Sequence, residues 1–145
     1  MAAIDDLRYY EMIRARLEHE DGMIVNRLSW LMASQSFLFT AYAIAAASPP
    51  VIANTASGGL AAIYRLVPWV GVATTTLIYA GLIAAVNSMG WLLKCFRARV
   101  TDETALGAPP LAPPWSILRW GMSAPLILPP LFILAWIVLL VALLT

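Results

Sequence analysis

Charged and amide side chains gather just before the first long apolar run of the chain, and they are of the types that bind cations. They are Glu18, His19, Glu20, Asp21 and Asn26. Carboxylates and imidazoles are common ligands of divalent cations. Consecutive residues of a helix point in different directions, so we predict no metal site within one chain. Around the axis of a symmetric oligomer, Glu18, Glu20 and Asp21 would form a cation-attracting mouth; the alternative is a solvated helix end.

A stripe of small and polar residues continues from this cluster through the apolar run. In steps of three and four it consists of His19, Gly22, Asn26, Ser29, Ala33, Ser36, Thr40, Ala43 and Ala47. At that spacing the members of this small-residue stripe share one face of a helix. Such a face either lines a water-filled pore, with His19, Asn26, Ser29, Ser36 and Thr40 as its polar groups, or packs tightly against another helix. The sequence leaves both interpretations open.

Two amides, Gln35 and Asn87, lie inside the expected membrane spans. Gln35 is five residues beyond Trp30, and Asn87 is four residues before Trp91. If both tryptophans mark the cytoplasmic face of the membrane, the amides lie at similar depth. We therefore predict that they contact each other or a neighbouring copy. Such a hydrogen bond holds helices together by about 0.6 to 2 kcal/mol; a role in permeation or substrate binding is the alternative.

Patterns typical of enzymes are missing from the sequence. It contains no G-x-S-x-G motif, no glycine-rich phosphate loop and no paired metal motif. Cys95 is the single cysteine, which excludes an intrachain disulfide and a cysteine metal cluster. The net charge of +1 gives no reason to expect a nucleic-acid partner. We predict no catalytic residues and no cofactor.

The composition is that of an integral membrane protein. Of 145 residues, 61% are hydrophobic and 12% are charged, and a soluble chain of this size could not bury so much apolar surface. We predict an all-α fold: a single membrane domain (residues 1–145) with three transmembrane helices and a long cytoplasmic N-terminal extension of the first. The expected segments are a cytoplasmic amphipathic helix at 4–27, a span at 28–47, an outer loop at 48–66, a span at 67–93, a cytoplasmic loop at 94–121 and a span at 124–144.

Details within these segments suggest how they are shaped. Tyr10, Ile13, Leu17 and Ile24 form an apolar seam at near-heptad spacing, which we expect to lie on lipid headgroups or to pair with a neighbouring copy. No proline separates this seam from the first span, so one long helix is expected. Pro129 and Pro130 predict a kink or a partly broken first turn in the third span.

The distribution of Lys and Arg predicts the orientation in the membrane. There are four before the first span, one in the first loop, four in the second loop and none at the C-terminus. Cytoplasmic segments carry an excess of these residues. The N-terminus and second loop are therefore expected in the cytoplasm and the C-terminus outside.

The stretch 18–43, EHEDGMIVNRLSWLMASQSFLFTAYA, resembles small uncharacterised bacterial inner-membrane proteins. The resemblance implies a bacterial inner-membrane protein with three or four spans, and it implies no activity. Because three isolated helices bury little surface, we expect the chain to assemble in the lipid bilayer, as a homo-oligomer or with another protein. The expected function is an ion channel whose pore is lined by the small-residue stripe. The alternative is an accessory or scaffold subunit in which the stripe is a packing seam and the N-terminal helix docks a protein partner.

Overall fold

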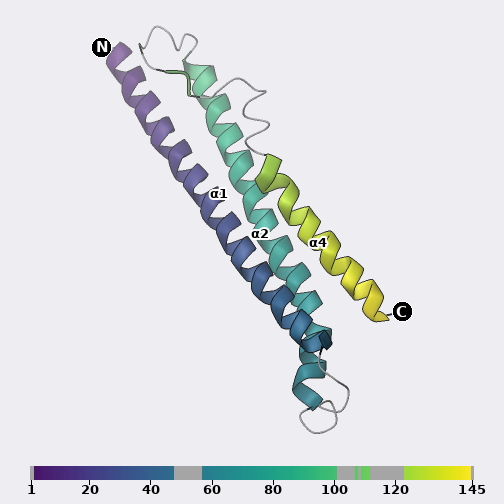
Figure 1. The fold of residues 1–145 in the computed structure, drawn as a ribbon. Coiled ribbons are helices and arrows are strands. Elements are labelled where there is room, and N and C mark those ends of the chain that lie inside the picture. Colours follow the sequence, from purple (N-terminus) through teal and green to yellow (C-terminus); the bar gives the residue numbers. More distant parts are fainter. Residues whose placement is uncertain (1, 48–56, 101–106, 108, 112–122, 145) are drawn as a thin grey trace.

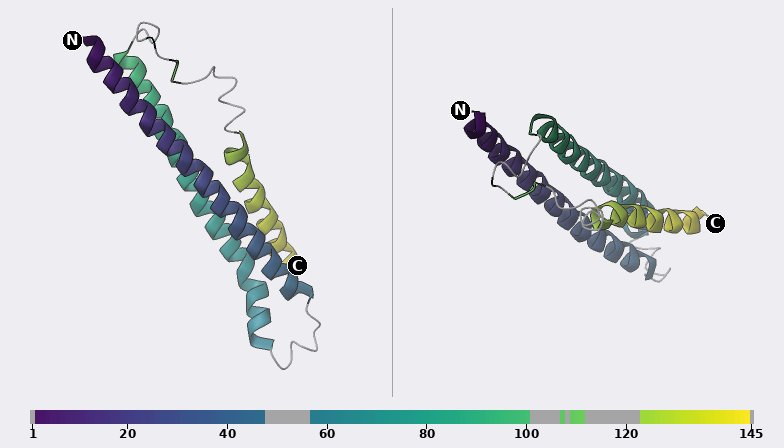
Figure 2. Two further views of the ribbon diagram at one scale, coloured as in Figure 1. Left: turned by 60° about the vertical axis from the view of Figure 1, so that its left-hand side comes forward. Right: turned by 90° about the horizontal axis from the view of Figure 1, so that it is seen from above.

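The structure, a computed structural model, describes residues 2–47, 57–100, 107, 109–111 and 123–144. In this part of the chain the fold is all-helical, with α1 at Ala2–Ala47, α2 at Ser57–Arg99 and α4 at Ser123–Leu144. α1 and α2 form a long antiparallel hairpin, and the shorter α4 lies along the half of it that holds the end of α1 (Figures 1 and 2). Each helix is long and apolar enough to cross a membrane.

α1 is one continuous helix of 46 residues, as its unbroken sequence predicted. It contains no proline, and Gly22 is helical like its neighbours. At 1.5 Å per residue the helix is about 69 Å long, which is well beyond the thickness of a bilayer. The segments expected at 4–27 and 28–47 therefore belong to a single rod.

A seven-residue repeat explains why α1 and α2 pack along most of their length. Tyr10, Leu17, Ile24 and Leu31 are buried at intervals of seven on α1. This spacing keeps one side of a helix facing an almost parallel neighbour. In the middle of the hairpin, Ile24 forms a buried hydrophobic cluster with Leu82 and Ala85 of α2.

Three side-chain contacts between the helices define the axial register of the hairpin. The Ser88 hydroxyl donates to Glu20 at 3.4 Å, and Arg27 Nη1 donates to the Gly81 carbonyl at 2.8 Å. Gln35 Nε2 donates to Thr74 Oγ1 at 3.4 Å. Seven residues forward from Glu20 to Arg27 thus match seven residues back from Ser88 to Gly81. This register gives each residue of α1 a height along the hairpin that can be compared with α2.

The apolar seam at the start of α1 packs on the end of α2. Tyr10, Ile13 and Leu17 form a buried cluster with Leu92, Phe96 and Val100. Our prediction that the seam faces lipid headgroups or a neighbouring copy is therefore wrong. The reason is that α2 continues to Arg99 and runs alongside the seam.

The helix ends differ from the expected segments. α2 begins ten residues before the expected span at 67–93 and ends six residues after it, so Pro68 lies inside the helix, where it is buried. α4 is helical through Pro129 and Pro130, and Pro129 is buried. Residues 57–66 of the outer loop expected at 48–66 form the first turns of α2, so this part of the prediction is wrong. Of the cytoplasmic loop expected at 94–121, residues 94–99 belong to α2, and most of the rest lies outside the described residues.

Candidate functional site

The small-residue stripe lies on the outside of the three-helix unit. All of its members, from His19 to Ala47, are exposed. Ser29 is two residues from both Arg27 and Leu31, which face α2, so it lies about 200° around the helix from each of them. Near Ser29 the stripe therefore faces away from α2, and its end at Ala43 borders a groove against α4.

The hydroxyl groups of the stripe are bonded to their own helix. Ser29 donates to the Val25 carbonyl at 3.0 Å, and Ser36 donates to the Met32 carbonyl at 2.8 Å. Thr40 donates to the carbonyl of Ser36 at 2.8 Å. These i to i−4 bonds satisfy the hydroxyl protons without an external partner. The part of the stripe from Ser29 to Ala47 can accordingly pack against a dry surface at little cost in lost hydrogen bonds.

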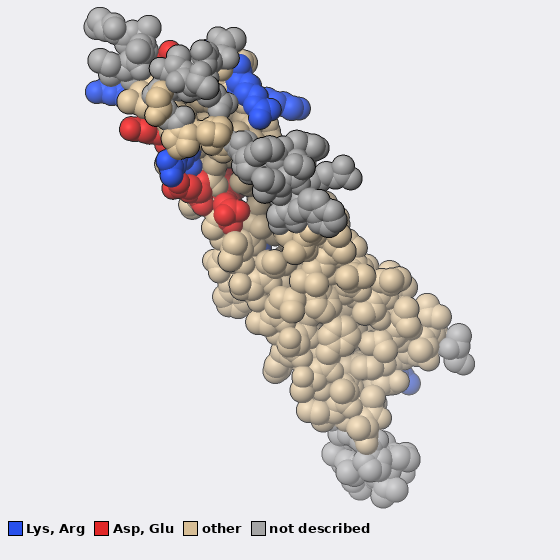
Figure 3. All heavy atoms as spheres, turned by 45° about the horizontal axis from the view of Figure 1, so that its top comes forward, with Lys and Arg blue, Asp and Glu red and all other residues tan. Residues whose placement is uncertain are grey.

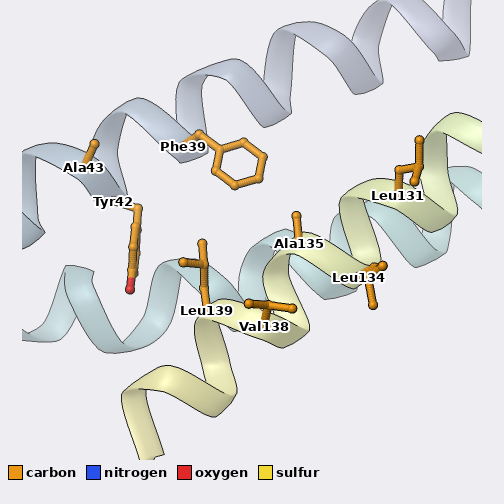
Figure 4. A pocket seen from close by; sticks show the side chains of 8 residues that line it. All are labelled: Phe39, Tyr42, Ala43, Leu131, Leu134, Ala135, Val138 and Leu139. Carbon is orange, nitrogen blue, oxygen red and sulfur yellow. The ribbon is translucent and has the colours of Figure 1, made fainter.

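An apolar groove runs beside the stripe, between the last turns of α1 and the middle of α4. It has a volume of about 660 Å³. It is lined by Phe39, Tyr42, Ala43, Leu131, Leu134, Ala135, Val138 and Leu139 (Figure 4). Ala43 belongs to both the groove and the stripe. In Figure 4 the Phe39 ring reaches from α1 towards α4.

A buried polar contact joins all three helices at this level. Gln35 and Trp136 are both fully buried. Trp136 Nε1 donates to Gln35 Oε1 at 2.6 Å, and Gln35 Nε2 donates in turn to Thr74 Oγ1. Because an indole nitrogen only donates, its partner must be the amide oxygen, which fixes the orientation of the Gln35 amide. This series of hydrogen bonds ends at the Val70 carbonyl, which accepts from Thr74 Oγ1 at 2.8 Å.

The Trp136 ring is held on three sides. It stacks on Phe39 with the ring centroids 4.1 Å apart and contacts Tyr42 edge-on with the centroids at 6.1 Å. Its third side lies on the backbone of α2 at Gly71, where an added Cβ would approach Trp136 Cδ2 to 2.6 Å. The indole is thus positioned by packing as well as by its hydrogen bond.

Asn87 does not join this contact. It is an exposed residue next to Ser88, and the register puts it near the height of Glu20, about 20 Å along the hairpin from Gln35. Our prediction that the two amides lie at similar depth is therefore wrong, and they do not meet within one chain. That prediction assumed that Trp30 and Trp91 mark the same face of the membrane. The register instead separates these two tryptophans by a similar distance along the hairpin.

The charged residues of the expected cation-attracting mouth are separated by the helix. Glu18 bonds to Arg14 Nε at 2.9 Å on the surface, and this hydrogen bond and the charge of Glu18 raise the pKa of Arg14. Glu20 turns towards α2 and accepts from Ser88, whereas Asp21 is exposed. Among the described residues, no three His, Cys, Asp or Glu side chains come together to hold a metal ion.

Of the residues that form the buried contact, Gln35 was identified from the sequence as an amide that holds helices together, but its partner Trp136 was not. A tryptophan twelve residues into the expected third span is unusual, because tryptophans favour the membrane interface. Its N–H would also need an acceptor in an apolar setting, which Gln35 supplies. No sequence signal pointed to Gly71.

Comparison with known proteins gives no relative from which a role for this site can be taken. No family model, curated protein or solved structure matches the chain.

Proposed function

We propose that this chain is a membrane-spanning assembly protein that self-associates through the outer face of α1. The observation that carries the proposal is the position of the small-residue stripe, which is exposed over its whole length in the single chain. Small side chains gain nothing from facing lipid, but they let another helix backbone approach closely. The scaffold interpretation of the sequence is thus favoured over the channel.

The membrane level that we propose follows from the hairpin register. The uncharged run at 28–47 of α1 lies beside approximately 61–80 of α2, and α4 lies beside the same part of the hairpin (Figure 1). The first 26 residues of α1 and the end of α2 would then project from the membrane as a helical stalk. Figure 3 supports this placement, because charged side chains gather at that end of the visible face.

The orientation that we propose places the stalk in the cytoplasm and the C-terminus outside. It is supported by the excess of Lys and Arg in the N-terminal segment and the second loop. The bacterial inner membrane as the location is supported by the sequence resemblance at 18–43. In this arrangement the stalk is available to dock a cytoplasmic protein.

The hydrogen bonding of the stripe supports a dry seam. Ser29, Ser36 and Thr40 donate to carbonyls of α1 itself, so burying them leaves no hydroxyl donor unpaired. The neighbouring residues Trp30 and Phe37 are exposed and bulky. A helix seated on the stripe would contact these side chains along one edge.

A pore is the second candidate function, and one observation favours it. Asn26, Ser29, Ser36 and Thr40 are exposed on one face of α1, with Ala33 on the turn between the two serines, so a symmetric ring of α1 helices would present polar oxygens along its axis. In this case copies would meet beside the stripe rather than on it.

A small-to-large substitution tests the seam directly. We expect Ala33→Phe and Ser36→Phe to disrupt the oligomer of the purified protein, measured as its mass in detergent. Ile127→Phe, on an exposed position of α4, is the matched control and should leave the mass unchanged. A monomeric wild-type protein would contradict self-association.

Ion flux separates the two candidates. The seam predicts no flux from liposomes containing the wild-type protein, and it predicts that Ser36→Asp dissociates the oligomer. The pore predicts flux, and it predicts that the oligomer tolerates Ser36→Asp because a water-lined face accepts a charge.

A further inference from the structure

We infer that neighbouring copies meet head to tail, with the outer face of α1 of one copy against the outer face of α2 of the next. This inference rests on the self-association proposed above and specifies its partner surface. Three features carry it: the charges at the stalk end of each helix, the small residues on the outside of α2, and the common height that the register gives to both faces.

In the stalk the exposed charges of α2 are all positive, whereas α1 exposes charges of both signs, with Glu11 among its carboxylates. Glu11 is exposed on α1, and Lys94 and Arg97 are exposed on α2. Among the described residues, none of these three forms an ion pair, because the ion pairs there join Arg14 to Glu18 and Arg99 to Asp6. They are available to a partner.

The charges also lie at matching heights. Extending the register from the contact between Glu20 and Ser88, nine residues back to Glu11 correspond to nine residues forward to Arg97. Copies inserted in a membrane with one orientation keep these heights. When α1 of one copy lies beside α2 of the next, Glu11 therefore comes level with Arg97.

In the half of the hairpin that holds the end of α1, another helix can approach the outside of α2 closely. Ala73, Ala80 and Ala84 are exposed there. Ala80 lies next to Gly81, which receives the bond from Arg27, so it is close to the height of Ser29 in the stripe. Around Ala80 and Ala84 small residues would then face small residues, and the backbones could approach closely there, with the exposed Leu77 one turn away.

The charges disfavour the symmetric alternative, in which two copies meet through α1 alone. A twofold axis along the membrane normal makes α1 pack parallel to its own copy, residue beside identical residue. Glu11, which forms no ion pair among the described residues, would then lie level with the same carboxylate of the other copy. Like charges at one height repel, whereas the head-to-tail contact sets a carboxylate level with a guanidinium.

Disulfide trapping tests the geometry. In a Cys95→Ser background, the double variant Ser29→Cys, Ala80→Cys should form covalent dimers and longer ladders on oxidation. The two positions cannot pair within one chain: each lies about 200° around its helix from residues in the α1–α2 contact, whereas a disulfide needs Cα atoms within about 7 Å. The pair Ala80→Cys, Ile127→Cys is the matched control and should stay monomeric.

The other outcomes of the cross-linking experiment separate a failure of the head-to-tail contact from a failure of self-association. Dimers from Ser29→Cys alone would overturn the head-to-tail contact and keep self-association. Oligomers of normal mass without any cross-link in the double variant would also overturn the inference. A monomeric protein without cross-links would overturn the proposed function itself.

A charge exchange provides a second measurement. Arg97→Glu and Glu11→Arg, each in the double-cysteine background, should lower the yield of cross-linked ladder by about two- to fivefold. Combining both should restore the yield. Arg16→Glu, at an exposed position of α1 where no ion pair is formed in the described chain, is the control. Equal yields from all variants would overturn the role of this charge pair.

Discussion

The indole of Trp136 lies against the backbone of Gly71, and no side chain could be added at that glycine without displacing the ring. An ideal Cβ at Gly71 would lie 2.5 Å from Trp136 Nε1. This close approach allows Trp136 on α4 to reach past α2 and bond to Gln35 on α1. One residue without a side chain thus permits a contact among three helices.

Gly71→Ala should destabilise the protein by about 1 to 3 kcal/mol, because the new methyl group overpacks the indole site. The measurement is the free energy of unfolding in mixed micelles, followed by circular dichroism during titration with a denaturing detergent. Gly90→Ala is the matched control. It also lies inside α2, but a Cβ there meets nothing within 4 Å, so the better helix propensity of alanine should leave stability unchanged or raise it.

Gln35→Leu should lower the free energy of unfolding by about 1 to 2 kcal/mol. It removes the acceptor of Trp136 Nε1 and leaves a buried N–H without a partner. A double-mutant cycle with Trp136→Phe should show that the two losses are not additive, since both variants break one bond. Asn87→Leu, the exposed amide of α2, should have little effect. Equal losses at both amides would argue against this assignment of the buried contact.

Arg27→Met should destabilise the hairpin by about 1 kcal/mol or more, because it keeps the apolar stem and removes the donor to the Gly81 carbonyl. The same unfolding titration measures the loss. Arg16→Met, at an exposed position, is the control and should be neutral. Gly81→Ala should be tolerated, since an added Cβ would make ordinary contact with Arg27 Nε at 3.7 Å. Severe destabilisation by this alanine would contradict the register.

Phe96→Ala should loosen the stalk end of the hairpin without unfolding the rest. Phe96 is fully buried, and its ring packs on Tyr9 and Tyr10 with the centroids about 6 Å away. Removing such a ring typically costs about 3 to 5 kcal/mol. Hydrogen exchange should therefore accelerate at the N-terminal turns of α1 and remain slow near Leu31. Trp91→Ala, which removes a ring that is 64% exposed on the same helix, should change exchange far less.

The sequence determined the helical content and the faces of the helices. The long apolar runs predicted three helices able to cross a membrane, and the absence of proline predicted an unbroken α1. The spacing of three and four residues put the small-residue stripe on one side, and the heptad positions from Tyr10 to Ile24 put an apolar seam on another. Such periodicities are local properties of a helix, so they can be read without its neighbours.

The tertiary structure decided which surfaces meet and at what height. A repeat of seven fits its partner helix at many axial shifts, so periodicity alone could not choose between Asn87 and Trp136 as the partner of Gln35. That choice depends on the fit of a large ring over Gly71 and on the bond from Arg27 to Gly81, which join residues far apart in the chain. For the same reason the sequence could not show that the apolar seam at the start of α1 packs on the end of α2. It also could not show that the small-residue stripe stays exposed in the single chain.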